Sequence, residues 1–154
     1  MDDARRRQLI PRYKDGPSTV REALEGMSDA QLDKRPSPGE WTPREIAHHL
    51  PDSEMTAAIR LRRLLAEDHP MIAGYDENEF ARRLRYQERP IGAALDALEA
   101  VRRVTAEVLE RMTDADWGRE GTHRESGRYS CEMWLEIYAA HAHDHAEQIL
   151  RSRS

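Results

Sequence analysis

The chain has 154 residues, 34% of which are charged, and its formal net charge is −5. A chain of this length usually forms one domain, so we expect a single domain over residues 1–154. The acidic balance excludes the strong positive field that attracts nucleic acid, and we expect no nucleic-acid partner. The charges have both signs and alternate with periodic apolar residues, which favours a folded helical protein over a disordered one.

Cysteine content and hydrophobic runs indicate where the protein resides. Cys131 is the only cysteine, so no intramolecular disulfide can form, as is usual in a reducing cytosol. The N-terminus lacks the apolar run of a signal peptide, and no stretch reaches the roughly eighteen apolar residues of a membrane span. We therefore expect a cytoplasmic protein that has no membrane partner.

Apolar residues recur every three or four positions in four segments, which predicts four long helices. The first is expected at about 4–27, with a kink or restart at the DGP of 15–17, because proline removes a helical hydrogen bond. The second should span about 42–67, since its TPRE start forms a capping box. The third follows a proline and covers about 90–112, and the fourth covers about 130–150 with a serine cap.

The connections between these helices are expected to contain shorter elements. We expect a short helical turn in SDAQLDKRP, a loop at 69–79, a short helix near 80–86 and an irregular segment at 118–130. The segments EGMSDAQLDKR and ERMTDADWGRE resemble each other at the ends of the first and third long helices. This echo favours two similar helical hairpins, with the second and fourth long helices as partners. The expected fold class is all-α, a four-helix bundle with short extra helices in its connections.

The last long helix carries three histidines within five residues. Successive helical residues turn by about 100°, so His141 and His145 share a face while His143 points elsewhere. The shared face also carries Trp134 and Tyr138, which makes it the apolar, inward face. We therefore expect two imidazoles inside the bundle and His143 on the outer face.

The second long helix contributes one more inward histidine. Measured from the apolar Ile46, His49 lies about 60° to one side, whereas His48 lies about 160° away. We expect His49 to point inward and His48 to lie on the outer face without a function. The two remaining histidines, His69 and His123, are assigned to loops, also without a function.

Three inward imidazoles from two helices fit a metal site. Imidazole serves zinc, nickel and ferrous iron well, and a catalytic zinc ion often has three protein ligands and an open position. An H-x-x-x-H pair places two ligands one helical turn apart, and bundles complete such sites from a neighbouring helix. The predicted ligands are His49, His141 and His145, with zinc or nickel as the expected ion and iron as a further candidate. The alternative is that all three are hydrogen-bonded core histidines.

Few other residues suggest chemistry. Tyr138 and Gln148 flank the paired histidines and could line a pocket or orient a ligand, or could be plain core. The arginines of RLRR at 60–63 could meet an anionic substrate or form a solvated face. Cys131 lies at a helix start, where the pKa of a thiol can fall. It is almost three turns from the predicted ligands, which argues against a role as a nucleophile or ligand.

Two segments carry a family resemblance: GEWTPREIAHHLPDSE at 39–54 and EIYAAHAHDHAEQI at 136–149, with looser agreement over 13–41. They are similar to the DinB/YfiT-like family of metal-binding four-helix bundles. The resemblance implies a metal triad at His49, His141 and His145, which are the same three residues that helical spacing selects.

The same resemblance implies a metal-dependent enzyme with a small-molecule substrate. Characterised relatives include S-transferases and isomerases that use low-molecular-weight thiols such as bacillithiol or mycothiol, and others are named only as metal-dependent hydrolases. Our first expectation is transfer of such a thiol cosubstrate to a small electrophile, with an ion that lowers the thiol pKa. Hydrolysis by activated water is an alternative, and so is a non-enzymatic stress-response protein with a structural metal. Exposed positions on the bundle also allow a homodimer.

Overall fold

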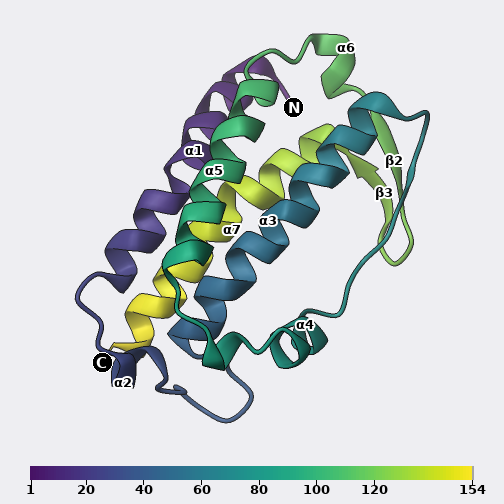
Figure 1. The fold of residues 1–154 in the computed structure, drawn as a ribbon. Coiled ribbons are helices and arrows are strands. Elements are labelled where there is room, and N and C mark those ends of the chain that lie inside the picture. Colours follow the sequence, from purple (N-terminus) through teal and green to yellow (C-terminus); the bar gives the residue numbers. More distant parts are fainter. Residues whose placement is uncertain (154) are drawn as a thin grey trace.

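The structure is a computed structural model and describes residues 1–153. Four long helices form a bundle: α1 (Asp3–Leu24), α3 (Pro43–Ala66), α5 (Gly92–Leu109) and α7 (Cys131–Ser152) (Figure 1). The predicted all-α four-helix-bundle class is therefore confirmed, with a small three-stranded sheet in addition. No helix in the described part of the chain combines the length and the hydropathy that crossing a membrane requires.

Short helices occupy the connections, as expected. They are α2 (Asp29–Leu32), α4 (Glu77–Arg83), the 3-10 helix η1 (Tyr86–Glu88) and α6 (Asp114–Trp117). The helices α2 and α6 follow α1 and α5, and each begins with a capping box, at Ser28 and at Thr113. The two segments that resemble each other in the sequence thus fold alike, because each encodes the same start signal.

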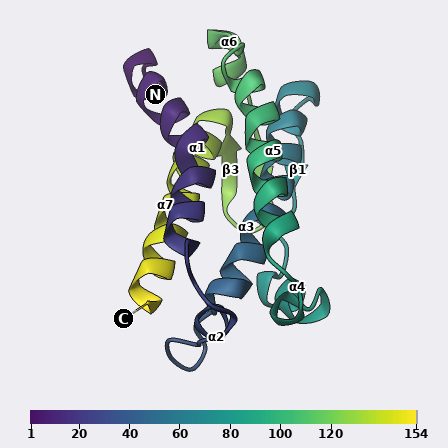
Figure 2. The ribbon, with the colours of Figure 1, turned by 60° about the vertical axis from the view of Figure 1, so that its left-hand side comes forward.

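The long helices are not arranged as two hairpins. Helix α1 packs against α7 and α5, whereas α3 packs against α5 and α7 (Figures 1 and 2). Helices α1 and α3 therefore lie diagonally across the bundle, as do α5 and α7, and the prediction of two helical hairpins is wrong. The segments that contain α2 and α6 carry the chain across the ends of the bundle. The prediction that the second and fourth long helices are neighbours is confirmed by the contact of α3 with α7.

Helix α1 continues through Pro17, so the predicted restart is absent. Proline lacks the N–H that would donate to the carbonyl of Tyr13 one turn earlier. The guanidinium of Arg102 from α5 replaces this donor, and its Nη1 lies 2.6 Å from the Tyr13 carbonyl oxygen. A Cβ atom on Gly16 would lie only 2.5 Å from Nη1 of Arg102, so the glycine makes room for this contact.

A buried ion pair joins all four long helices near the middle of the bundle. Nε of Arg102 lies 2.9 Å from Oε2 of Glu54 on α3, and the two side chains are 1% and 0% exposed. Arg102 also donates to the carbonyl of Tyr138 on α7 at 2.9 Å. The Tyr13 hydroxyl of α1 donates to Oε1 of Glu54 at 2.5 Å. Each charge therefore has several partners, as buried charges require.

A three-stranded sheet lies beside the bundle (Figure 1). Its strands are β1 (Met71–Ile72), β2 (Glu120–His123) and β3 (Gly127–Ser130), with β2 antiparallel to β3 and parallel to β1. The expectation of a plain loop before residue 80 and an irregular segment at 118–130 is therefore wrong. The strands are too short and too polar to show an alternating pattern in the sequence. At Gly121 a Cβ atom would lie 2.3 Å from the carbonyl oxygen of Pro70, so only glycine fits there.

The apolar core has two parts that lie along the bundle. One is built around Trp134 and Leu61 and reaches Tyr138. The other is built around Leu50 and Ile149. On α7 the boundary between the two parts falls between Ala139 and Ala142, so His141 lies at this boundary and His145 lies just beyond it, in the second part.

Candidate metal centre

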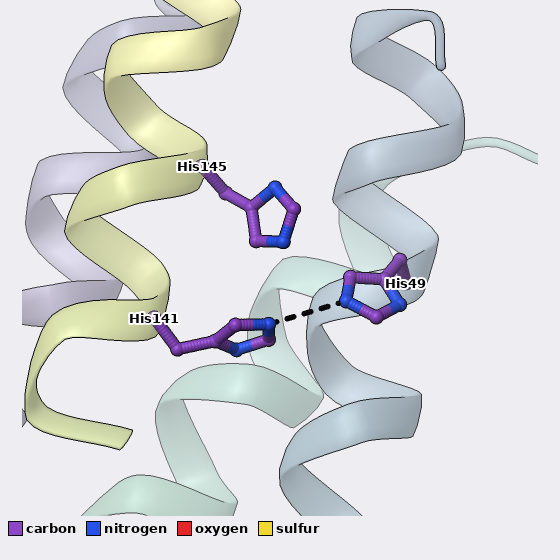
Figure 3. A group of neighbouring side chains, drawn as sticks. All are labelled: His49, His141 and His145. Carbon is purple, nitrogen blue, oxygen red and sulfur yellow. Dashed lines mark hydrogen bonds between the residues drawn. The ribbon is translucent and has the colours of Figure 1, made fainter. Parts of the chain in front are cut away.

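The three predicted ligands lie together between α3 and α7. Figure 3 shows His49 facing the rings of His141 and His145 from the opposite helix. One nitrogen atom from each ring lies within 4.8 Å of the other two. The Nε2 atoms of His49 and His141 are 3.3 Å apart, and the ring centroids of the three pairs are 5.2, 5.0 and 4.7 Å apart.

Helix caps set the rotation of the two helices and thus the direction of these rings. Thr42 and Glu45 form a complete capping box at the start of α3. At the start of α7, the Ser130 side chain accepts a hydrogen bond from the backbone N–H of Met133. A fixed start determines which later residues point inward, because each residue advances the helix by a constant angle.

Burial keeps the three imidazoles neutral. His49 is 1% exposed, and burial followed by the nearby His145 lowers its pKa to about 3. Burial, followed by the charges of His145 and His49, lowers the pKa of His141 to about 2. Burial also lowers the pKa of His145, although a hydrogen bond with Gln148 opposes the effect. Neutral imidazole is the form that binds a metal ion.

The hydrogen bonding of these rings fits metal ligands better than core histidines. Within residues 1–153, Nδ1 of His49 and Nδ1 of His141 are buried without a hydrogen-bond partner. Buried polar atoms normally have a hydrogen-bond partner. The polar contact that these two rings make is with each other, between their Nε2 atoms. Three neutral imidazoles form a donor set that suits a divalent ion such as zinc, nickel or iron.

Residues around the triad hold its rings in place. Nδ1 of His145 lies 2.9 Å from Oε1 of Gln148, so the ring donates there and its Nε2 remains free to bind an ion. This contact fits the interpretation of Gln148 as an orienting residue. The ring of Trp41 packs edge-on against His49, with centroids 4.6 Å apart. Helical periodicity does not reveal this contact, because Trp41 precedes α3.

Within residues 1–153 the group contains no fourth protein ligand. Among the described residues, the cluster of histidine, cysteine and acidic side chains that could hold an ion consists of the three histidines alone. Three protein ligands and an open position are typical of catalytic rather than structural zinc sites.

Two histidines that were assigned to outer faces are placed differently. His48 is 2% exposed, its Nε2 lies 3.0 Å from the Arg89 carbonyl oxygen, and its ring stacks on Tyr86. The outer-face prediction for His48 is therefore wrong, because the segment after α4 folds back onto that side of α3. His143 is half-buried, with Nε2 2.8 Å from the carbonyl oxygen of Arg12 on α1.

Cys131 and the remaining histidines lie away from the triad. Burial raises the pKa of the Cys131 thiol to about 11, so the decrease suggested by its helix-start position is absent. His123 lies in β2 rather than in a loop. His69 lies in a turn, where its Nε2 is 2.9 Å from Oγ1 of Thr122.

The chain is similar to known proteins over most of its length. Residues 12–149 match the family described as the DinB superfamily. A protein of Oceanobacillus iheyensis, named "Putative metal-dependent hydrolase", is 34% identical over 92% of this chain and 82% of its own length. A protein of Geobacillus thermodenitrificans with the same name is 32% identical over 96% of this chain and 83% of its own length.

Two solved structures have a similar fold. YfiT from Bacillus subtilis, described as "a probable metal-dependent hydrolase with an unusual four-helix bundle topology", superposes with a TM-score of 0.94 at 27% identity, over 99% of this chain and 87% of YfiT. The mycothiol-dependent maleylpyruvate isomerase superposes with a TM-score of 0.73 at 12% identity, over 94% of this chain and 60% of the isomerase. The second likeness concerns the fold alone.

Proposed function

Because this chain belongs to the DinB superfamily, we propose that it is a metal-dependent hydrolase that acts on small molecules. The observation that carries the proposal is the convergence of three neutral imidazoles, with no acidic or thiol side chain joining them in the described part of the chain. Two relatives that are 34% and 32% identical to this chain carry the name "Putative metal-dependent hydrolase". Their names support the same assignment for this chain.

In this proposal the residues of the site have distinct roles. His49, His141 and His145 hold the ion, and Gln148 keeps the His145 proton on Nδ1. Trp41 covers one side of the His49 ring, and apolar core on both sides of the triad limits access of bulk water. Once bound, a divalent ion would supply Lewis-acid chemistry by lowering the pKa of a water molecule or, in the second candidate function, of a thiol.

The second candidate function is transfer of a low-molecular-weight thiol to a small electrophile. The thiol would have to be a cosubstrate, because Cys131 is fully buried and its pKa is raised rather than lowered. An open position beside three imidazoles accommodates a thiol as well as a water molecule. The two candidates therefore differ in the nucleophile and share the ligands.

Activity assays with and without a thiol distinguish the candidates. The protein is loaded separately with zinc, nickel and ferrous iron, and hydrolysis of p-nitrophenyl acetate is measured with and without bacillithiol. We expect hydrolysis that needs the metal, does not need the thiol and is lost in His141→Ala. The matched control is His143→Ala, which removes an imidazole two residues away on the same helix and should retain activity.

Other results would change the assignment. Consumption of monochlorobimane only when bacillithiol is present would replace the hydrolase with the transferase. Metal-loaded protein that turns over neither substrate class, or activity that survives complete chelation, would refute a catalytic ion and favour a structural metal.

A further inference from the structure

The half-buried Arg60 of α3 connects this helix to α7 and to the segment that follows β1. Its Nη1 donates to the Tyr138 hydroxyl at 3.2 Å, and its Nη2 donates to the Ala73 carbonyl oxygen at 2.8 Å. Its Nε atom is buried and has no hydrogen-bond partner within residues 1–153. Arg63, by contrast, pairs with Glu67 at the surface. The sequence-based interpretation of a solvated arginine face therefore holds for Arg63 and fails for Arg60.

Two tyrosines add further donors at the same place. Tyr129 of β3 is 4% exposed, and Tyr75 lies between β1 and α4. Both hydroxyl groups are buried and have no hydrogen-bond partner within 3.5 Å among the described residues. At longer range, Tyr138 and Arg60 act on the pKa of the Tyr129 phenol through charge and side-chain hydrogen bonding, and a side-chain hydrogen bond with Ser53 acts on the pKa of Tyr75. We call Arg60, Tyr75, Tyr129 and Tyr138 the donor cluster.

The donor cluster adjoins the histidine triad. Tyr138 precedes His141 by one helical turn, and their ring centroids are 5.9 Å apart. On the opposite helix, Ser53 lies one turn after His49 and acts on the Tyr75 phenol. The segment from β1 to α4, which carries Tyr75, runs beside α3 (Figure 1). The cluster therefore extends from the triad along the same pair of helices.

The chemistry of the donor cluster suits a carboxylate. Three of its groups, one guanidinium N–H and two phenol O–H groups, have no acceptor within 3.5 Å in the described part of the chain, and buried donors normally have a close acceptor. Arg60 is its only cation, which matches a singly charged anion better than a phosphate. A planar carboxylate accepts several hydrogen bonds and pairs well with arginine. Glu77 lies nearby, but it is exposed and forms no ion pair with Arg60 in the described part of the chain.

We infer that the donor cluster binds the carboxylate of a small substrate and so directs the reacting group of that substrate to the histidine triad. The place of reaction rests on the proposed function, whereas binding of the carboxylate needs no ion. The inferred substrate class is a short monocarboxylic acid derivative, with about one helical turn, roughly 5 Å, between the carboxylate and the reacting atom.

Binding of butanoate and of its neutral analogue butanamide tests this inference. Both are titrated by NMR into the full chain, metal-free and zinc-loaded, while the Arg60 Nε–H signal and the backbone amides of residues 73–75 are followed. We expect butanoate to shift these signals in both states, with at least tenfold weaker binding of butanamide. Arg60→Gln should weaken butanoate binding at least tenfold, and Arg63→Gln, the matched control on the same helix, should leave it unchanged.

Several outcomes would overturn the inference. Equal binding of acid and amide, or no shift at all, would mean that water alone occupies the cluster. Shifts that occur only with zinc present would mean that butanoate binds the ion. Should Arg60→Gln fail to fold, Tyr129→Phe and Tyr75→Phe remove one donor each and keep the rings, and unchanged affinity in both would also refute the inference. Because the metal-free titration involves no turnover, a failed hydrolase assay leaves it intact, and the reverse also holds.

Discussion

Replacing Glu54 by glutamine should destabilise the protein strongly. Glu54 is 0% exposed and accepts hydrogen bonds from Arg102 and from the Tyr13 hydroxyl. Glutamine has nearly the same shape, so the change removes a charge without creating a cavity. The guanidinium of Arg102 would then remain in the interior without a counter-charge, and this uncompensated charge is the cause of the expected loss.

The expected loss follows from the burial of the pair. Breaking a buried ion pair by removing one partner costs about 3–5 kcal/mol, and glutamine retains some hydrogen bonding, so we expect about 3 kcal/mol. Domains have a total free energy of unfolding of about 5–15 kcal/mol, so the variant should be visibly less stable. In a chain of this size the midpoint of thermal unfolding should fall by roughly 6–12 °C.

Urea unfolding followed by circular dichroism measures this loss. The matched control is Glu110→Gln, which breaks an exposed ion pair with Lys14 at 2.7 Å and should leave the free energy of unfolding nearly unchanged. The double variant Glu54→Gln with Arg102→Met should recover part of the stability, because it removes both charges. If Glu54→Gln lowered the free energy of unfolding by less than about 1 kcal/mol, the conclusion that it leaves the buried charge of Arg102 uncompensated would be refuted.

Three further predictions concern the triad and the cysteine. Gln148→Leu should weaken zinc binding about 10–100-fold in competition with a chelator, because His145 loses the acceptor for its Nδ1 proton, and unchanged affinity would exclude an orienting role. The metal-free protein should lose stability as the pH falls below about 6.5, because unfolding lets His49 and His141, whose pKa values are lowered to about 3 and 2, take up protons. Urea midpoints between pH 7 and 5 measure this loss, which should be smaller in His141→Ala; an equal loss in the variant would contradict it. Cys131 should react with Ellman's reagent at pH 8 only after unfolding, since burial raises its pKa to about 11, and rapid reaction of the native protein would be the opposite result.

The ligands of the candidate site could be predicted because helical phase is a local property. Capping signals at Thr42 and Ser130 define where two helices begin, and the rotation from there places His49, His141 and His145 inward. No knowledge of the rest of the chain is needed for this step. The same local signals account for the lengths of the long helices and for the two short capped ones.

The errors concern contacts between segments that are far apart in the sequence. His48 lies on the less apolar side of its helix, and only the return of the chain near Arg89 buries it. A proline such as Pro17 would interrupt a helix in most settings. Here Arg102, 85 positions later in the sequence, supplies the hydrogen-bond donor that the proline lacks. In the small sheet, residues 71–72 pair with residues 122–123, and no local sequence pattern predicts this pairing.

The diagonal order of the helices has a consequence for synthesis of the chain. Helices α1 and α3 do not pack together although one follows the other, and α1 packs instead on α5 and on α7, which is synthesised after the other three long helices. A growing chain that ends before residue 131 would lack α7, one of the two partners of its first helix, and two of the three imidazoles. We expect such a nascent chain to remain loosely packed and dependent on chaperones, and the complete chain to fold more slowly than bundles whose neighbouring helices are joined directly.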